Sequence, residues 1–135
     1  MNKFDLNNKN AIITGGAQGF GLDIAKRFLQ SGAKVIIWDF DEKELNKASK
    51  LINDQNLSFD VVDISDPKSV DDVVNKITSK TKIDILINNA GITGSTAELW
   101  NYDYEEWKKI VNINLHGTFN CCKSVVPHMI NNNYG

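Results

Sequence analysis

Apolar residues recur along the chain in short runs that alternate with segments of helical periodicity. Four β-rich runs begin near Ala11, Lys34, Leu57 and Ile83, and the first three each lead into a helical segment. Regular alternation of this kind is typical of strand–helix units that build a parallel sheet with helices on its faces. The pattern therefore predicts an α/β fold in three layers, with at least four parallel strands.

The helical segments carry recognisable end signals. Residues 24–29 hold one apolar stripe, and Gly32 follows at the place where a left-handed residue ends a helix. Residues 70–77 hold a second stripe, and Asp66 and Pro67 precede it as an N-cap and a first-turn proline. We expect a helix over each stripe.

The longest helical pattern runs from Trp107 to Met129, and we expect its apolar residues to share one core-facing side. Pro127 would lie in its final turn or at a kink. Asn114 falls on this stripe, four residues after Ile110. A buried amide without partners costs about 1–3 kcal/mol, so Asn114 is either a structural staple between two helices or a functional residue.

The fourth strand has apolar side chains on both faces, at Ile83, Ile85, Leu86 and Ile87, which predicts helices above and below it. The residues after it are helix and loop and supply no further strand, and an uncovered strand edge invites association. We therefore expect residues 1–135 to be one incomplete domain, whose C-terminal half is absent.

Composition excludes several kinds of partner. Hydrophobic residues make up 41%, charged residues 24% and the net charge is −2, so no basic face for nucleic acid or an anionic membrane is expected. The longest apolar run, 35–38, is too short for a bilayer, and residues 1–6 hold no apolar segment of signal-peptide length. We expect a cytoplasmic protein without a metal site, in which Cys121 and Cys122 are two buried, reduced thiols on a helix.

A glycine-rich turn follows the first strand, with the sequence Thr14-Gly15-Gly16-Ala17-Gln18-Gly19-Phe20-Gly21. Glycines let the backbone approach a pyrophosphate, and the N-terminus of the next helix attracts phosphate groups. The glycine spacing does not fit the G-x-G-x-x-G fingerprint. It also does not fit the P-loop, because no lysine follows the last glycine.

Polar residues also follow the other three strands. Asp39 ends the second strand, where a carboxylate can accept hydrogen bonds from both ribose hydroxyls of an adenosine and would repel a 2′-phosphate. This predicts NAD rather than NADP, unless a nearby basic residue compensates. Asp63 follows the third strand and 88–91 follows the fourth. Since the carboxyl ends of parallel strands form one rim, we expect these residues to meet in a single ligand site.

Together these motifs and Val111-Asn112-Ile113-Asn114-Leu115 resemble the short-chain dehydrogenase/reductase family, and its 3-oxoacyl-acyl-carrier-protein reductase-type members most of all. The resemblance covers essentially the whole chain, which corresponds to about the first half of a typical member. It implies a Rossmann-like fold with strand order 3-2-1-4 and a nicotinamide cofactor.

The resemblance also implies roles for individual residues. Those expected against the cofactor phosphates and the adenosine ribose are Gly15, Gln18, Gly19, Phe20 and Gly21. Asp39 is expected at the ribose hydroxyls, and Phe40, Asp63 and Ile64 are expected at the adenine. Asn89, Ala90 and Gly91 are expected along the path toward the nicotinamide.

Asn114 would be the first member of the family's Asn-Ser-Tyr-Lys catalytic set, and its backbone would help hold a water in a proton relay. The serine, tyrosine and lysine of that set are absent from this chain. Tyr104 and Lys108 have the Tyr-x-x-x-Lys spacing, but they precede Asn114 in an acidic, surface-like stretch, and we do not assign them a catalytic role.

The implied activity is hydride transfer between the nicotinamide and a carbonyl or secondary alcohol, with a 3-oxoacyl, sugar or alcohol substrate. We expect a homo-oligomer for the complete enzyme and little or no turnover from these 135 residues alone. Two alternatives stay open: a non-catalytic dinucleotide-binding module, and a Rossmann-like domain for another nucleotide such as a methyl-donor cofactor, in which residues 88–91 have no clear role.

Overall fold

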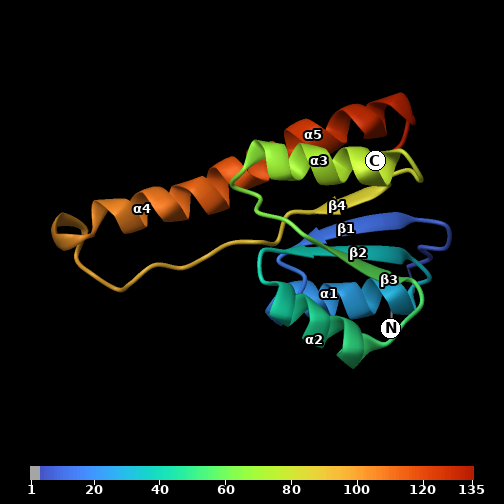
Figure 1. Ribbon diagram of the computed structural model, residues 1–135, viewed down its shortest axis with the longest axis horizontal. Coiled ribbons are helices and arrows are strands. Elements are labelled where there is room, and N and C mark those ends of the chain that lie inside the picture. Colours follow the sequence, from blue (N-terminus) through green and yellow to red (C-terminus); the bar gives the residue numbers. More distant parts are fainter. Residues whose placement is uncertain (1–3) are drawn as a thin grey trace.

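Parallel strands form the centre of the molecule, as Figure 1 shows for the computed structural model, which describes residues 4–135. The beginning of the N-terminal segment considered above, residues 1–3, lies outside the described residues. Within the described part, one sheet has the order β3-β2-β1-β4. Its strands are β1 (Asn10–Thr14), β2 (Lys34–Asp39), β3 (Leu57–Val61) and β4 (Ile85–Ile87). The predicted fold class and strand order are confirmed.

Helices cover both faces of this sheet. The helices α1 (Gly19–Gln30) and α2 (Glu42–Ile52) lie on one face, and α3 (Pro67–Thr78) and α5 (Thr118–Asn131) lie on the other (Figure 1). Between β4 and α5 come a short 3-10 helix η1 (Leu99–Asn101), the helix α4 (Tyr104–Val111) and a π-helical stretch η2 (Asn112–Gly117). Of the helices in residues 4–135, none has the length and apolar character needed to cross a lipid bilayer.

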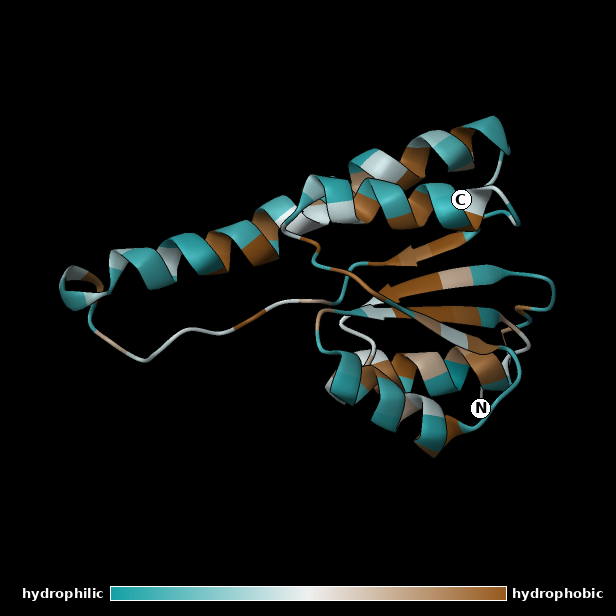
Figure 2. Ribbon diagram, viewed as in Figure 1, coloured by the Kyte–Doolittle hydropathy of each residue, from teal (hydrophilic) through white to brown (hydrophobic). Residues whose placement is uncertain are grey.

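Strand β2 shows how the sheet builds two cores. Val35 and Ile37 pack into the cluster under α1 and α2, whereas Ile36 and Trp38 belong to the cluster under α3 and α5. Successive strand residues point to opposite faces, so a strand that is covered on both sides must be apolar at nearly every position. Figure 2 shows this as apolar strands between helices that are apolar on one side.

The predicted helix ends are confirmed. Gly32 follows α1 with a φ of +92°, a conformation that glycine adopts at low cost. The Asp66 side chain caps α3 by accepting a hydrogen bond from the Lys68 backbone N–H at 3.0 Å, and Pro67 is the first residue of that helix. Local signals in the sequence therefore mark these two helix ends.

The expectation of one core-facing side from Trp107 to Met129 is wrong. Cys121 and Val125 are fully buried on the α3 side of α5, but Trp107, Leu115 and Phe119 are 52%, 63% and 60% exposed. The cause is geometric, because α4 and the segment before it extend beyond the sheet (Figure 1), where no described residue lies opposite their outer side.

The two cysteines also differ from each other. Cys121 is buried as predicted, and burial together with the neighbouring Cys122 raises the pKa of its thiol to about 12. Cys122 is only half-buried, and its sulfur accepts a hydrogen bond from Asn88 Nδ2 at 3.3 Å. Both are free thiols.

We predict that Asp66→Ala lowers the free energy of unfolding by about 1 kcal/mol, because the first turn of α3 loses its side-chain acceptor. Urea unfolding followed by circular dichroism measures the change. Asp72→Ala is the matched control, since Asp72 lies on the same helix in an exposed pair with Lys68 and should leave stability nearly unchanged. Equal losses for both variants would contradict the capping role.

Candidate functional site

The site is organised around the hydroxyl of Thr14, the last residue of β1. Its Oγ1 accepts hydrogen bonds from the backbone N–H groups of Asn89 (3.1 Å) and Ala90 (3.0 Å), and lies 3.4 Å from the Ile87 carbonyl oxygen, to which it donates. Thr14 is 1% exposed. This buried hydroxyl therefore satisfies backbone groups at the end of β4 and fixes the two loops relative to each other.

The Asn89 side chain completes this connection. Its Nδ2 donates to the carbonyl oxygens of Thr14 (3.0 Å) and Gly15 (3.1 Å). Gly15 has a φ of +62°, and a Cβ there would lie 2.8 Å from Ala90 Cα. The close approach of the two loops thus requires glycine at position 15.

The N-terminus of α1 is open toward the same rim. Gly19 begins the helix with a φ of +54°, and a Cβ placed there would meet nothing within 4 Å. Gln18 at the N-cap makes no side-chain capping bond and the first turn holds no acidic residue, whereas Asp41 and Asp66 cap α2 and α3. The first N–H groups of α1 are thus available to an anion.

A pocket of about 550 Å³ lies along the carboxyl ends of the strands. Its lining includes every predicted cofactor-contact residue except Gly19 and Gly21, which lie in the adjoining turn. A Cβ at Gly21 would collide with the Gly15 carbonyl oxygen, so this glycine shapes the turn. Lining residues that the sequence analysis missed are Trp38, Val62, Ser65, Ile92, Lys109, Asn112 and Ile113.

Two carboxylates stand in this lining. Asp39 Oδ1 accepts from the Asp41 backbone N–H at 3.2 Å. Asp63 Oδ1 accepts from the Ser65 backbone N–H at 2.9 Å and from the Ser65 hydroxyl at 2.6 Å. These bonds hold the side chains in place, and in both residues they use Oδ1 and leave Oδ2 as an acceptor. The pair can therefore bind hydroxyl or amino donors of a ligand.

Asn114 lies in η2, and the structure corrects its predicted burial, because its side chain is exposed. It pairs with the backbone of Ile92, whose N–H donates to Oδ1 at 2.8 Å and whose carbonyl accepts from Nδ2 at 2.9 Å. The buried amide of this helical segment is Asn120, which donates to the Ile64 carbonyl at 2.9 Å. A π-helical turn adds a residue per turn, so a stripe drawn at regular helical spacing rotates off the core-facing side.

Tyr104 does not take part in the pocket. It begins α4, is 68% exposed, and its ring lies under the Lys108 ammonium at 5.1 Å. Lys108 also pairs with Glu105 at 2.7 Å. The position of Tyr104 on an exposed helix agrees with the interpretation that its spacing to Lys108 carries no catalytic meaning.

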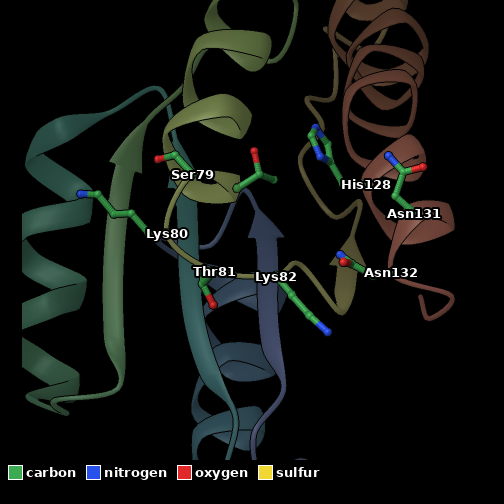
Figure 3. Close-up of a pocket in the computed structure, with 8 residues that line it drawn as sticks. Ser79, Lys80, Thr81, Lys82, His128, Asn131 and Asn132 are labelled. Atoms are coloured by element: carbon green, nitrogen blue, oxygen red, sulfur yellow. The ribbon is translucent and has the colours of Figure 1, made fainter.

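A second pocket of about 320 Å³ lies at the opposite end of the sheet, between the ends of α3 and α5. Figure 3 shows its side chains around an open hollow, with Lys80 extending away from His128 and Asn131. The C-terminal carbonyl groups of two helices meet there, which disfavours an anion. Its lining residues are polar, but no helix N-terminus of the described chain faces this pocket as that of α1 faces the first one.

A parallel α/β sheet with a pocket at the carboxyl ends of its strands is typical of nucleotide-binding proteins, and sequence comparison makes the class specific. A family model described as short chain dehydrogenase matches residues 9–135. The chain belongs to that family.

Individual relatives extend this result. Over 93% of its length the chain is 36% identical to 2-dehydro-3-deoxy-L-rhamnonate dehydrogenase (NAD(+)) of Sphingomonas sp. (strain SKA58), and covers 50% of that protein. Over 91% of its length it is 39% identical to 3-oxoacyl-acyl-carrier-protein reductase of Chlamydia trachomatis, of which it covers 51%. The chain thus spans about half the length of the curated relatives it matches.

Solved structures agree. The crystal structure of 3-ketoacyl-(acyl-carrier-protein) reductase from Brucella melitensis complexed with NADH matches 95% of the chain with a TM-score of 0.89 and 36% identity. The chain covers 53% of that structure. The Rossmann-like fold of the short-chain dehydrogenases is therefore shown for this part of the sequence.

We predict that Thr14→Val destabilises the protein by about 1–3 kcal/mol, because the Asn89 and Ala90 N–H groups lose their common acceptor inside the structure. Thr14→Ser is the matched control, since it keeps the hydroxyl and removes only a methyl group. Thermal and urea unfolding of the three proteins measure the effect. A serine variant as unstable as the valine variant would show that packing, and not the hydroxyl, holds the loops.

Proposed function

We propose that this chain binds NAD and forms the cofactor-binding half of a dehydrogenase or reductase that acts on a carbonyl or secondary alcohol. The observation that carries the proposal is the pocket at the strand ends, which has the open N-terminus of α1 beside it and Asp39 and Asp63 in its lining. An anion-attracting end and two acceptor side chains in one cleft match the phosphates and the adenosine of a dinucleotide.

The residues present fit such a ligand. The space beside Gly19 is empty to 4 Å, so backbone N–H groups can be approached closely. The Phe20 and Phe40 side chains are 85% and 74% exposed and both line the pocket, where they offer flat apolar surfaces to a ribose or a base. The pocket volume of about 550 Å³ also suits a ligand of this size.

The preference for NAD over NADP rests on Asp39. A carboxylate accepts hydrogen bonds from ribose hydroxyls, and it repels the charge of a 2′-phosphate. The basic residue of the lining, Lys109, lies on α4, outside the β2–α2 turn that holds Asp39. One relative is named as NAD(+)-dependent and one solved relative is complexed with NADH, whereas RhlG of Pseudomonas aeruginosa, 27% identical with a TM-score of 0.85, is an NADP complex. The choice of NAD therefore rests on Asp39 alone.

The chemistry would be shared between the cofactor and the protein. A bound nicotinamide supplies or accepts a hydride, and the chain must hold it in register with the substrate. Thr14 and Asn89 fix the loops along which the ligand would lie, and Asn114 holds the loop at Ile92. By family resemblance Asn114 is the catalytic member present here, while the serine, tyrosine and lysine of the set would come from sequence beyond Gly135.

Further residues would also complete the fold. On its outer side β4 has no neighbouring strand among the described residues, and Leu115, Phe119 and Val126 of η2 and α5 are 63%, 60% and 40% exposed. Apolar helix faces and open strand edges are normally covered. We propose that the remaining half of the protein covers them, in an assembly of several copies. A cytoplasmic location and a 3-oxoacyl, sugar or alcohol substrate remain predictions.

We predict that the unmodified protein binds NADH more tightly than NADPH, and that Asp39→Ala weakens NADH binding about ten-fold, the effect of losing roughly 1.4 kcal/mol. The variant should bind NADPH no worse than the unmodified protein, because the repulsion of the 2′-phosphate is removed. Isothermal titration measures both ligands, and Asp72→Ala on the outer side of α3 is the control. Tighter binding of NADPH by the unmodified protein would contradict the NAD assignment.

The coding sequence beyond Gly135 tests the catalytic part of the proposal. An in-frame strand, then a serine and a Tyr-x-x-x-Lys motif on a following helix, is the expected result. A stop codon directly after Gly135 would contradict the enzyme and leave a dinucleotide-binding module.

A further inference from the structure

Residues 91–97 form a loop that leaves the pocket without regular secondary structure. They follow β4, and within the described part of the chain none of them makes a backbone-to-backbone hydrogen bond. Gly91 and Ile92 line the pocket, whereas residues 93–97 do not. Backbone polar groups that lack such bonds are bound by side chains or by water. The side chains that bind this loop therefore decide where this end of the pocket lies.

Two side chains of the neighbouring helical segment bind the loop at two points. Asn114 bonds to the backbone N–H and the carbonyl of Ile92. Glu106 of α4 binds Ser95, where Oε1 accepts from the backbone N–H at 2.9 Å and Oε2 accepts from the hydroxyl at 2.5 Å. A loop held at Ile92 alone could turn about that point, whereas a second attachment at Ser95 fixes its direction.

The loop packs closely against the helix between these two points. Glu106, Ile110 and Asn114 are spaced four residues apart, so they lie on the same side of the helical segment. A Cβ at Gly94 would collide with the Ile110 side chain and with the Tyr102 hydroxyl, so the loop backbone lies directly against this side. The loop thus follows one helix face from its first attachment to its second.

Helix capping does not account for the Glu106 side chain. Asp103 is the N-cap of α4, and its side chain accepts from the Glu106 backbone N–H at 2.7 Å. A glutamate three residues after an N-cap commonly turns back to the backbone N–H of the N-cap residue. Here both carboxylate oxygens instead bind Ser95, which belongs to the loop. The side chain thus holds the loop and does not cap its own helix.

We propose that Glu106 is a positioning residue for the nicotinamide half of the bound dinucleotide, because its attachment of Ser95 sets the place of Gly91 and Ile92 in the pocket. This inference rests on the proposed function, since it concerns the same ligand. With the adenosine at Asp39 and the phosphates at the N-terminus of α1, the nicotinamide extends toward the loop. Neither Glu106 nor Ser95 lines the pocket, so the effect passes through the loop between them and the ligand.

A comparison of two ligands distinguishes this role from a general effect on stability. ADP-ribose carries the adenosine and the phosphates but no nicotinamide. In isothermal titration, Glu106→Ala should weaken NADH binding about three- to five-fold and change ADP-ribose binding by less than about two-fold. Glu106→Gln keeps one acceptor oxygen and should restore most of the affinity for NADH. Glu105→Ala is the matched control, because Glu105 lies in an exposed pair with Lys108 on the same helix and should change neither affinity.

The link to Ser95 is tested by nuclear magnetic resonance and by a double variant. The Ser95 amide should exchange slowly with solvent in the unmodified protein and faster in Glu106→Ala. Ser95→Ala removes the hydroxyl donor, so it should weaken NADH binding by the unmodified protein but cause no further loss in Glu106→Ala. Circular dichroism and the melting temperature establish that each variant is folded before titration.

The outcomes separate the inference from the function on which it rests. An unmodified protein that binds neither NADH nor ADP-ribose would overturn the proposed function and this inference with it. If both ligands bind, a folded Glu106→Ala that leaves NADH affinity unchanged, or that weakens both ligands equally, would overturn the role of Glu106 alone. Should Glu106→Ala fail to fold, Ser95→Ala decides, and an NADH affinity equal to that of the unmodified protein would overturn the inference.

Discussion

The shared hydroxyl of Thr14 is the interaction on which the site depends. Neighbouring parallel strands end side by side, and the loops that follow β1 and β4 must then separate to leave room for a ligand. Thr14 Oγ1 accepts from the N–H groups of Asn89 and Ala90 at this branching point, and Asn89 Nδ2 returns two bonds to the first loop. Because these groups are part-buried, losing one partner leaves others unsatisfied, so the loops keep one relative position. The left-handed conformation of Gly15 follows from that position, and so does the placement of the pocket residues in these two loops.

The charge along the pocket changes from one end to the other, because the helix N-termini are capped differently and the two carboxylates lie toward one end. At α2 and α3 an aspartate side chain occupies the helix N-terminus, but at α1 the N-cap residue is Gln18, which makes no capping bond. The partial positive charge of α1 is thus left for a ligand. Asp39 and Asp63 lie at the ends of the next two strands and place negative charge in the same lining. A ligand that is anionic in its middle and rich in hydroxyl and amino groups at one end matches this distribution.

Most of the fold and much of the pocket could be predicted from the sequence, because both follow from local rules. Strand β2 is apolar on both faces, and the cap at Asp66 and the glycine at 32 mark helix ends within a few residues. Once the strands are parallel, their carboxyl ends must share a rim, so the sequence predicts that Asp39, Asp63 and Asn89 lie in one site, and all three line the pocket. The family resemblance added the individual roles.

The features of the structure that could not be predicted leave no periodic pattern in the sequence. A π-helical stretch at 112–117 rotates the helix surface, so Asn114 lies exposed against Ile92, while Asn120 takes the buried position. Trp38 looks like any apolar strand residue in the sequence, and only the complete set of hydrogen bonds shows that its Nε1 is unpaired. In both cases the sequence identifies the residue type, but the environment is set by contacts with residues distant in the chain.

The segment between β4 and α5 lines one side of the pocket, and contacts within the segment itself give it a defined conformation. The Ser95 backbone and hydroxyl both bond to Glu106, and these bonds hold the pKa of the Glu106 carboxyl below its ordinary value. Tyr102 packs edge to face on Trp107 at 6.4 Å. The extended loop and α4 are thus joined to each other by their own contacts, and Asn114 of η2 also bonds to the backbone of that loop at Ile92. Residues 92, 109 and 112 line the pocket from this segment, so its internal bonds, and not only the sheet, determine the shape of that side of the pocket.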